Sequence, residues 1–215
     1  MTSPIIIKQN FLSPLQCEGI LNDFKTNLVN LDNNKNPIAT ERKITSWEAD
    51  IAIEFSELIV QIEQNYGCAY KGLHEPVLQM FPENPSKPAK NIGCENSEFF
   101  RKKWVMKKDV DLVGYIWLKT YNDNIQNGKF DINEEIYGGC LEFPQFNFHI
   151  KPEAGTLVIL PAGPHFLTAI SPVMVGDLYQ IKLNISVKNS EGKQWFYDPS
   201  KFPKSYQEWF FNNNQ

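Results

Sequence analysis

Residues 137–187 read YGGCLEFPQFNFHIKPEAGTLVILPAGPHFLTAISPVMVGDLYQIKLNISV, and this stretch decides the expected fold. Its short apolar runs are separated by turn residues, namely the Gly138-Gly139 pair, the Lys151–Gly155 segment, residues 161–164 and the Gly176-Asp177 pair. Strand-length runs with turns roughly every eight to twelve residues are typical of β-sandwiches and barrels. The stretch therefore predicts a mainly β core.

The N-terminal part of the chain carries two helix patterns. Ser13 suits the N-cap of a helix, and Pro14 suits its first position. Apolar side chains then recur at helical spacing to about Val29, and a second pattern of this kind covers residues 47–66. We expect both helices, within an N-terminal part that spans residues 10–67, to pack on one face of a sheet.

Strand patterns return from residue 76. Residues 77–81 and the strongly apolar run 110–118 predict strands of a β core that spans about residues 76–187. The polar residues 121–136 form a long connection, which is either a lid or substrate loop at the mouth of the barrel or a variable surface insertion. The aromatic side chains of the C-terminal segment, residues 188–215, predict a strap packed on the core, or alternatively a surface that forms a homodimer.

The composition narrows the class of protein. A chain of 215 residues is long enough for a single domain with a sizeable core. The net charge of −4 argues against nucleic acid as a partner, and we interpret the basic residues between 101 and 108 as a solvated loop. The chain has no apolar run of about eighteen residues, so we expect no membrane span. Its four cysteines lack CxxC spacing, which suits a reducing compartment and predicts a cytoplasmic protein.

The order of these pieces resembles the 2-oxoglutarate- and Fe(II)-dependent dioxygenases of the prolyl-hydroxylase type. The resemblance rests on the stretch from Gly138 to Gly176 and on Phe11-Leu12-Ser13-Pro14 before the first helix. It implies a double-stranded β-helix, or jelly roll, with N-terminal helices packed on one sheet. It also implies an enzyme that uses Fe(II) and 2-oxoglutarate to hydroxylate a small-molecule or peptide substrate.

In this family, a histidine on a late strand binds iron together with a His-x-Asp/Glu pair on an early strand. His165 follows the strand and turn of residues 155–161, and Pro172-Val173 with Gly176 resembles the segment after that histidine. The usual spacing instead places Thr168 at the ligand position. Because a hydroxyl is a poor Fe(II) ligand, we interpret His165 as the metal ligand, with a local bulge that accounts for the spacing. The alternative is a loop histidine beside prolines.

The early metal motif falls on Gly93-Cys94-Glu95, counted back from the strand at residues 110–118. Glu95 supplies the expected carboxylate, whereas Gly93 stands where the family has histidine. Cys94, His74 or water could fill the open ligand position, although strand alternation directs Cys94 to the opposite face from Glu95. The resemblance thus assigns the metal to Glu95 and His165 and leaves one ligand open.

In this family, a basic residue binds 2-oxoglutarate. The position of this residue is occupied by Asp177-Leu178 in the present sequence. Lys182 lies further along the same strand with the side-chain parity of Leu178, among mostly apolar residues. A buried ammonium group needs a partner. This partner is either the carboxylate of 2-oxoglutarate or an internal Asp or Glu, unless the side chain reaches solvent. Trp117 would line the same pocket, or else belong to the core.

Two functional hypotheses follow. The first is a 2-oxoglutarate- and Fe(II)-dependent oxygenase that hydroxylates an unidentified substrate. The alternative is a binding module that keeps the jelly roll and its pocket but lacks a complete iron site. A cupin-like isomerase or sugar-binding protein would share the architecture without any supporting motif, and the sequence has no phosphate-binding loop, hydrolase elbow or His-Glu-x-x-His helix.

Overall fold

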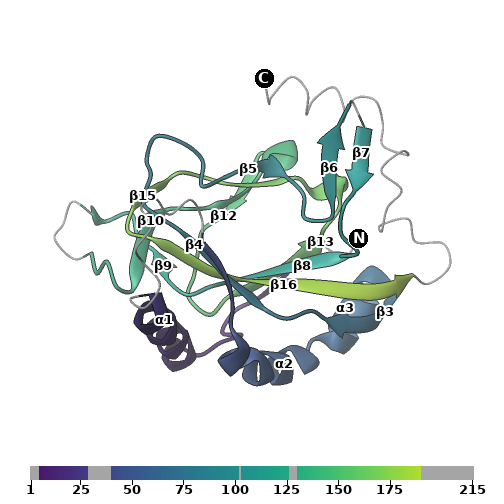
Figure 1. Cartoon of the computed structure of the whole chain (residues 1–215), viewed down its shortest axis with the longest axis horizontal. Coiled ribbons are helices and arrows are strands. Elements are labelled where there is room, and N and C mark those ends of the chain that lie inside the picture. The colour runs from purple at the N-terminus through teal and green to yellow at the C-terminus, as the bar shows by residue number, and fades with distance from the viewer. Residues whose placement is uncertain (1–4, 29–39, 102, 126–129, 190–215) are drawn as a thin grey trace.

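The computed structural model describes residues 5–28, 40–101, 103–125 and 130–189 (Figure 1). Nearly all of the predicted C-terminal strap, and with it the alternative of a homodimer surface, lies outside these residues. Within the described ranges, no helix is both long and apolar enough to cross a membrane.

A seven-stranded antiparallel sheet forms the larger layer of the molecule (Figure 1). Its strands run in the order β1-β13-β8-β16-β4-β2, and β3 pairs with the second half of β16. Their bounds are Ile6–Lys8 for β1, Leu157–Pro161 for β13, Leu112–Trp117 for β8, Leu178–Asn189 for β16, Val77–Phe81 for β4, Thr40–Lys43 for β2 and Cys68–Leu73 for β3.

A second layer of shorter strands lies opposite the first (Figure 1). It contains a four-stranded sheet in the order β12-β11-β14-β5 and a three-stranded sheet in the order β15-β10-β9, beside the hairpin of β6 and β7. The bounds are Phe148–Ile150 for β12, Leu141–Phe143 for β11, Thr168–Ile170 for β14, Lys90–Gly93 for β5, Val173–Val175 for β15, Glu135–Gly138 for β10, Thr120–Tyr121 for β9, Ser97–Phe100 for β6 and Lys103–Met106 for β7. The two layers confirm the predicted mainly β jelly-roll core.

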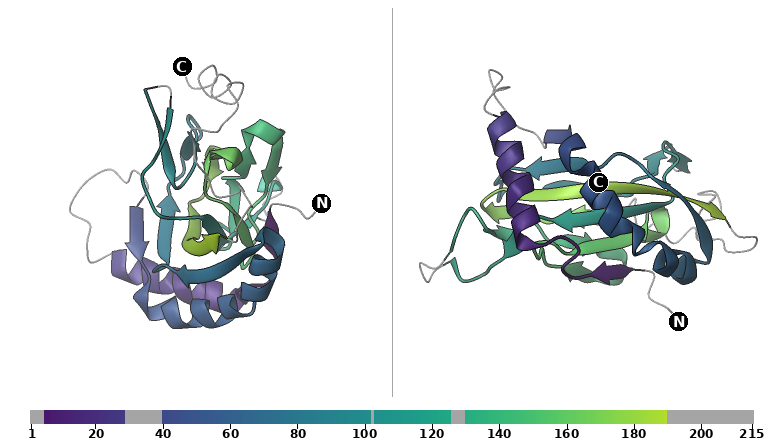
Figure 2. Two further views of the ribbon diagram at one scale, coloured as in Figure 1. Left: turned by 90° about the vertical axis from the view of Figure 1, so that its right-hand side faces the viewer. Right: turned by 90° about the horizontal axis from the view of Figure 1, so that it is seen from below.

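Helices cover the outer face of the larger sheet, as predicted, but the described residues form three of them instead of the two expected (Figures 1 and 2). They are α1 (Pro14–Leu28), α2 (Glu48–Ser56) and α3 (Ile59–Tyr66). Ser13 caps α1, because its Oγ accepts a bond from the backbone N–H of Gln16 at 3.3 Å, while its own N–H donates to Gln16 Oε1 at 2.8 Å.

The single helix expected over residues 47–66 is divided in two. The backbone N–H of Leu58 donates to the carbonyl of Phe55, three residues back, at 3.0 Å. This bond belongs to a tighter turn than the α-helix and separates α2 from α3. A short 3-10 turn, Thr45–Trp47, precedes α2 and occupies the predicted start of the helix.

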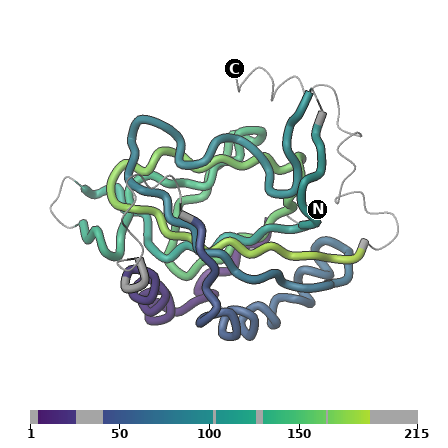
Figure 3. Tube along the Cα trace, viewed as in Figure 1, coloured from purple at the N-terminus to yellow at the C-terminus, as the bar shows by residue number. Residues whose placement is uncertain are grey.

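Strand alternation gives the larger sheet two different faces. The predicted buried strand is β8, and all of its residues are buried. Leu112 and Ile116 pack in the cluster under the helices, whereas Tyr115 and Trp117 belong to the cluster between the two layers. As the tube colours in Figure 3 show, the strands that meet in this sheet come from distant parts of the chain.

Candidate functional site

The interior face of β8 and β16 carries the predicted cosubstrate residues. Lys182 on β16 is paired with Tyr115 on β8, and Gln180 is paired with Trp117. All four side chains are buried. They share the face that looks toward the second layer, because the alternating residues such as Ile181 lie in the cluster under the helices. The structure therefore places Lys182 and Trp117 inside the jelly roll.

Glu95 reaches the same interior from the segment after β5. The backbone N–H groups of Glu95 and Asn96 both donate to the carbonyl of Ala162, at 3.0 and 3.1 Å, and so fix this segment against the end of β13. Tyr115 donates its hydroxyl to Glu95 Oε1 at 2.8 Å. Lys182 Nζ lies 3.7 Å from Glu95 Oε2, so the predicted metal residue and the predicted cosubstrate residue lie side by side.

Lys90, at the start of β5, completes this group. Its Nζ forms an ion pair with Glu95 Oε1 and donates to the hydroxyl of Tyr115 at 3.2 Å. Glu41 on β2 is the second acidic partner of Lys182, with its Oε1 at 3.1 Å from Nζ. The interior thus holds two ammonium groups around one buried carboxylate, and a further carboxylate, half exposed, at the edge.

Electrostatics keep the buried carboxylate ionised. Burial acts to raise the pKa of Glu95, but the charges of Lys90 and Lys182, with the hydrogen bonds from Lys90 and Tyr115, lower it to about 2. Burial and the neighbouring Glu95 charge raise the pKa of Tyr115 well above its ordinary value. Tyr115 therefore stays protonated and acts as a donor to Glu95.

Gly93 and Thr168 are the two positions at which the usual family spacing expects metal-binding histidines, and they lie opposite each other. Gly93 on β5 and Thr168 on β14 are paired in register, with a register shift between Thr168 and Ile170. Thr168 is buried, and a Cβ added at Gly93 would find no atom nearer than 4.0 Å, the carbonyl oxygen of Asn91. The structure thus brings Gly93 and Thr168 together, and neither residue carries an imidazole.

The histidines and Cys94 lie in separate surroundings. His165 falls in the 3-10 turn Pro164–Phe166, and its side chain is outside the described part, so its role as a ligand stays a prediction. His74 Nε2 shares a 2.7 Å hydrogen bond with Ser186 Oγ, and His149 is exposed on β12. Cys94 Sγ donates to the carbonyl of Ser97 at 3.3 Å, and burial raises the pKa of this thiol to about 12.

These donors do not fit Fe(II). Among the described residues, no group of three or more His, Cys, Asp or Glu side chains could hold a metal ion. The carboxylate of Glu95 faces an ammonium group from each of Lys90 and Lys182. A divalent cation placed at this carboxylate would therefore meet two like charges and, among the described side chains, would find too few ligands of the kind that iron requires.

A row of hydrogen-bonded polar side chains, Gln180, Gln79 and Glu41, crosses the strands beside Lys182. Gln180 Nε2 donates to Gln79 Oε1 at 2.9 Å, and Gln79 Nε2 donates to Glu41 Oε1 at 2.5 Å. On the other side of Gln180 lie Trp117 and Thr156. Trp117 Nε1 and Thr156 Oγ1 are buried without a hydrogen-bond partner in the described structure, so this end of the row has unused donors.

Sequence reasoning missed Lys90, Tyr115 and the two glutamines. Tyr115 could have been found from the strand pattern, because it has the same parity as Trp117 on an apolar strand. Gln180 likewise has the parity of Lys182. No sequence pattern marked Lys90 as an interior residue, because only the pairing of β5 with β14 brings it into the jelly roll.

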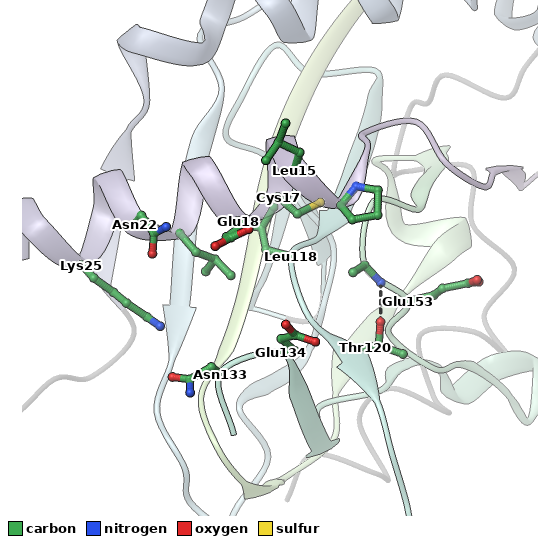
Figure 4. A pocket seen from close by; sticks show the side chains of 13 residues that line it. Leu15, Cys17, Glu18, Asn22, Lys25, Leu118, Thr120, Asn133, Glu134 and Glu153 are labelled. Atoms are coloured by element: carbon green, nitrogen blue, oxygen red, sulfur yellow. Dashed lines mark hydrogen bonds between the residues drawn. The ribbon is translucent and has the colours of Figure 1, made fainter. Parts of the chain in front are cut away.

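A separate cavity of about 670 Å³ lies outside the jelly roll, between α1 and the segments that lead into β9 and β10 (Figure 4). Glu18 and Lys25 of α1 line one side, and Glu134 lines the other. None of the predicted metal or cosubstrate residues lines this cavity, so it is distinct from the interior site.

Comparisons with known proteins agree with the architecture. No family model and no curated protein matches the sequence. Solved structures do match. The viral collagen prolyl hydroxylase vCPH from Paramecium Bursaria Chlorella virus-1, in a 2OG complex, aligns over 87% of this chain and 97% of its own, with 14% identity and a TM-score of 0.58.

Two further prolyl hydroxylases align in the same way. The Pseudomonas putida prolyl-4-hydroxylase has 13% identity and a TM-score of 0.58 over 86% of this chain and 94% of its own. The Trichoplax adhaerens enzyme, in complex with a hypoxia inducible factor peptide fragment, has 14% identity and a TM-score of 0.53 over 85% and 83%. The chain has the prolyl-hydroxylase fold. At these identities the likeness concerns the fold alone.

Proposed function

We propose that this protein is a jelly-roll binding protein for a small organic acid, with 2-oxoglutarate as the first candidate, and that binding requires no iron. The observation that carries the proposal is a pair of buried polar atoms on the interior face, Trp117 Nε1 and Thr156 Oγ1, which have no hydrogen-bond partner among the described residues. Lys182, which is paired with Glu41 and Glu95, lies on the neighbouring strand. A buried donor without a partner is unfavourable by about 1–3 kcal/mol, which an oxygen acceptor of a ligand would remove.

The strand register supports one shared subsite. Leu157 pairs with Ile116, and this register ends there, because Trp117 forms an isolated bridge with Ala154. The backbone N–H of Trp117 still donates to the Thr156 carbonyl at 3.4 Å, so the two residues lie close together. Trp117 in turn pairs with Gln180 on β16. A carboxylate offers several acceptor positions and no donor, which complements an indole N–H, a hydroxyl and an ammonium group.

A second candidate is the 2-oxoglutarate- and Fe(II)-dependent oxygenase. The pairing of Gly93 with Thr168, close to Glu95, supports it, because the resemblance expects metal ligands on these two segments. In that case Glu95 and His165 would hold the iron, Lys182 would bind 2-oxoglutarate, and the substrate would be a small molecule or a peptide such as the one bound to the Trichoplax neighbour. The ion pairs of Glu95 with two lysines weigh against it.

Calorimetric titration of the full chain with 2-oxoglutarate in the presence of EDTA tests the first proposal. We expect saturable binding that succinate competes for and that the neutral dimethyl ester does not. Replacing Trp117 by Phe removes one donor while keeping a ring, and should weaken binding about tenfold, a difference of about 1.4 kcal/mol. Trp47→Phe, on the helical side of the sheet, is the matched control and should leave the affinity unchanged.

The same titration separates the two candidates. Binding that needs Fe(II), together with a weak visible charge-transfer band under anaerobic conditions and 2-oxoglutarate turnover in air, would establish the oxygenase. If no acid of this class binds with or without the metal, both candidates are wrong.

A further inference from the structure

Lys90 is the residue that most distinguishes this interior from a metal site. Its Nζ is bonded to Glu95 Oε1 and to the Tyr115 hydroxyl, and it lies 5.6 Å from the centre of the Tyr115 ring. These three residues belong to β5, to the segment after it and to β8. One ammonium group therefore joins the two layers of the jelly roll at the point where Glu95 enters.

The carboxylate of Glu95 requires such a cation. Only 10% of the Glu95 side chain is exposed, and an isolated buried carboxylate is strongly unfavourable. Oε1 accepts bonds from Lys90 and Tyr115, while Oε2 faces Lys182 at 3.7 Å. Both oxygens are thus engaged by groups of the chain itself.

We propose that Lys90 is a built-in substitute for a metal ion, which neutralises Glu95 and holds β5 against β8 without any bound cation. Gly93 and Thr168 are consistent with this role, since neither supplies an imidazole beside the carboxylate. The inference goes beyond acid binding, because it concerns how the interior is assembled and holds for any ligand or for none.

The sharpest test restores the missing imidazoles and then removes the lysine. Gly93→His/Thr168→His places two imidazoles on paired positions beside Glu95, a two-histidine, one-carboxylate set. A side chain at position 93 has room, since a Cβ there would meet nothing within 4.0 Å except the Asn91 carbonyl. With Lys90 present we expect weak Co(II) binding, and adding Lys90→Met should lower the Kd for Co(II) at least tenfold. Adding Lys87→Met instead, on an exposed residue of the preceding loop, should change nothing.

Binding is followed by the visible absorption of Co(II) and by the metal-dependent rise in melting temperature. Equal Co(II) affinity with and without Lys90 would overturn the proposal. So would tight Co(II) or Mn(II) binding by the unmodified chain, because the site would then not be held by lysine.

A double-mutant cycle in the natural sequence covers the case in which the restored variants fail to fold. Lys90→Met and Glu95→Gln should each lower the melting temperature by roughly 5 °C or more, and the double variant should lose clearly less than the sum. Strictly additive losses would mean that Lys90 does not act through Glu95, and the proposal would be wrong. Neither readout depends on 2-oxoglutarate, so failure here is distinct from failure of the proposed binding function.

Discussion

The two faces of the larger sheet are built from the same strands but by different chemistry. Under the helices, β8, β13 and β16 present side chains that are apolar apart from the Tyr179 hydroxyl to one cluster. Toward the second layer, the same strands present Tyr115, Trp117, Gln180 and Lys182 among apolar neighbours. The outer face therefore holds the fold by packing, and the inner face keeps polar groups that packing alone does not need.

The largest expected effect concerns the outer face. Leu183 is fully buried beside Leu157 and Gly114 in the middle of the sheet. Leu183→Ala should lower the free energy of unfolding by about 4 kcal/mol, because the surrounding strands and helices cannot close the cavity. Urea denaturation measures this loss. It should be the same at pH 4 and pH 7, and a loss that depends on pH would contradict a purely apolar role.

Glu95→Gln tests the inner face, with a smaller and pH-dependent effect. The folded pKa of Glu95 is about 2 against an ordinary value of 4.5, so the ionised form stabilises the fold above the unfolded pKa. At pH 7 the variant should lose on the order of 3 kcal/mol of unfolding free energy.

This loss should shrink as the pH falls from about 5 toward 2, where the carboxylate of the natural chain becomes protonated. Urea denaturation across this range gives the difference between the two chains. A constant difference would mean that Glu95 acts through packing and not through its charge.

The contrast between the faces also shows what the sequence could predict. Parity along β16 assigned Lys182 to the side of Leu178, and Lys182 does lie on this interior face. Counting back from β8 singled out Glu95, which lies beside Lys182 in the structure, whereas its role as a metal ligand stays a prediction. The identity of the partners could not be predicted in this way. Lys90 and Glu95 meet because β5 ends at Gly93 and the chain then turns inward, and Glu41 arrives from the sheet edge.

The division of the second helix could not be predicted from the sequence either. The apolar side chains keep their helical spacing through Leu58, whereas the α-helical hydrogen bonding of the backbone is interrupted there. Periodicity reports which side of an element is apolar. It does not report the register between strands that are far apart in the chain. Here that register pairs Gly93 with Thr168, and so determines which side chains lie near Glu95.

The smallest expected effects come from two glycines, which compare the packing of the outer face with that of the interior beside Glu95. Gly114 lies on the outer face of β8, where an added Cβ would meet Leu157 Cδ1 at 3.1 Å and Leu183 Cβ at 3.3 Å. Gly114→Ala should therefore lower the free energy of unfolding by about 1–2 kcal/mol through overpacking.

At Gly93 the same added Cβ would meet no atom within 4.0 Å other than the Asn91 carbonyl oxygen. Gly93→Ala should be neutral or stabilise by up to about 1 kcal/mol, because alanine restricts the unfolded chain more than glycine does. Parallel thermal and urea unfolding of the two variants gives the comparison directly. A clear loss at Gly93 would mean that the interior beside Glu95 is as tightly packed as the outer face, which would leave no room for a ligand at this end of the jelly roll.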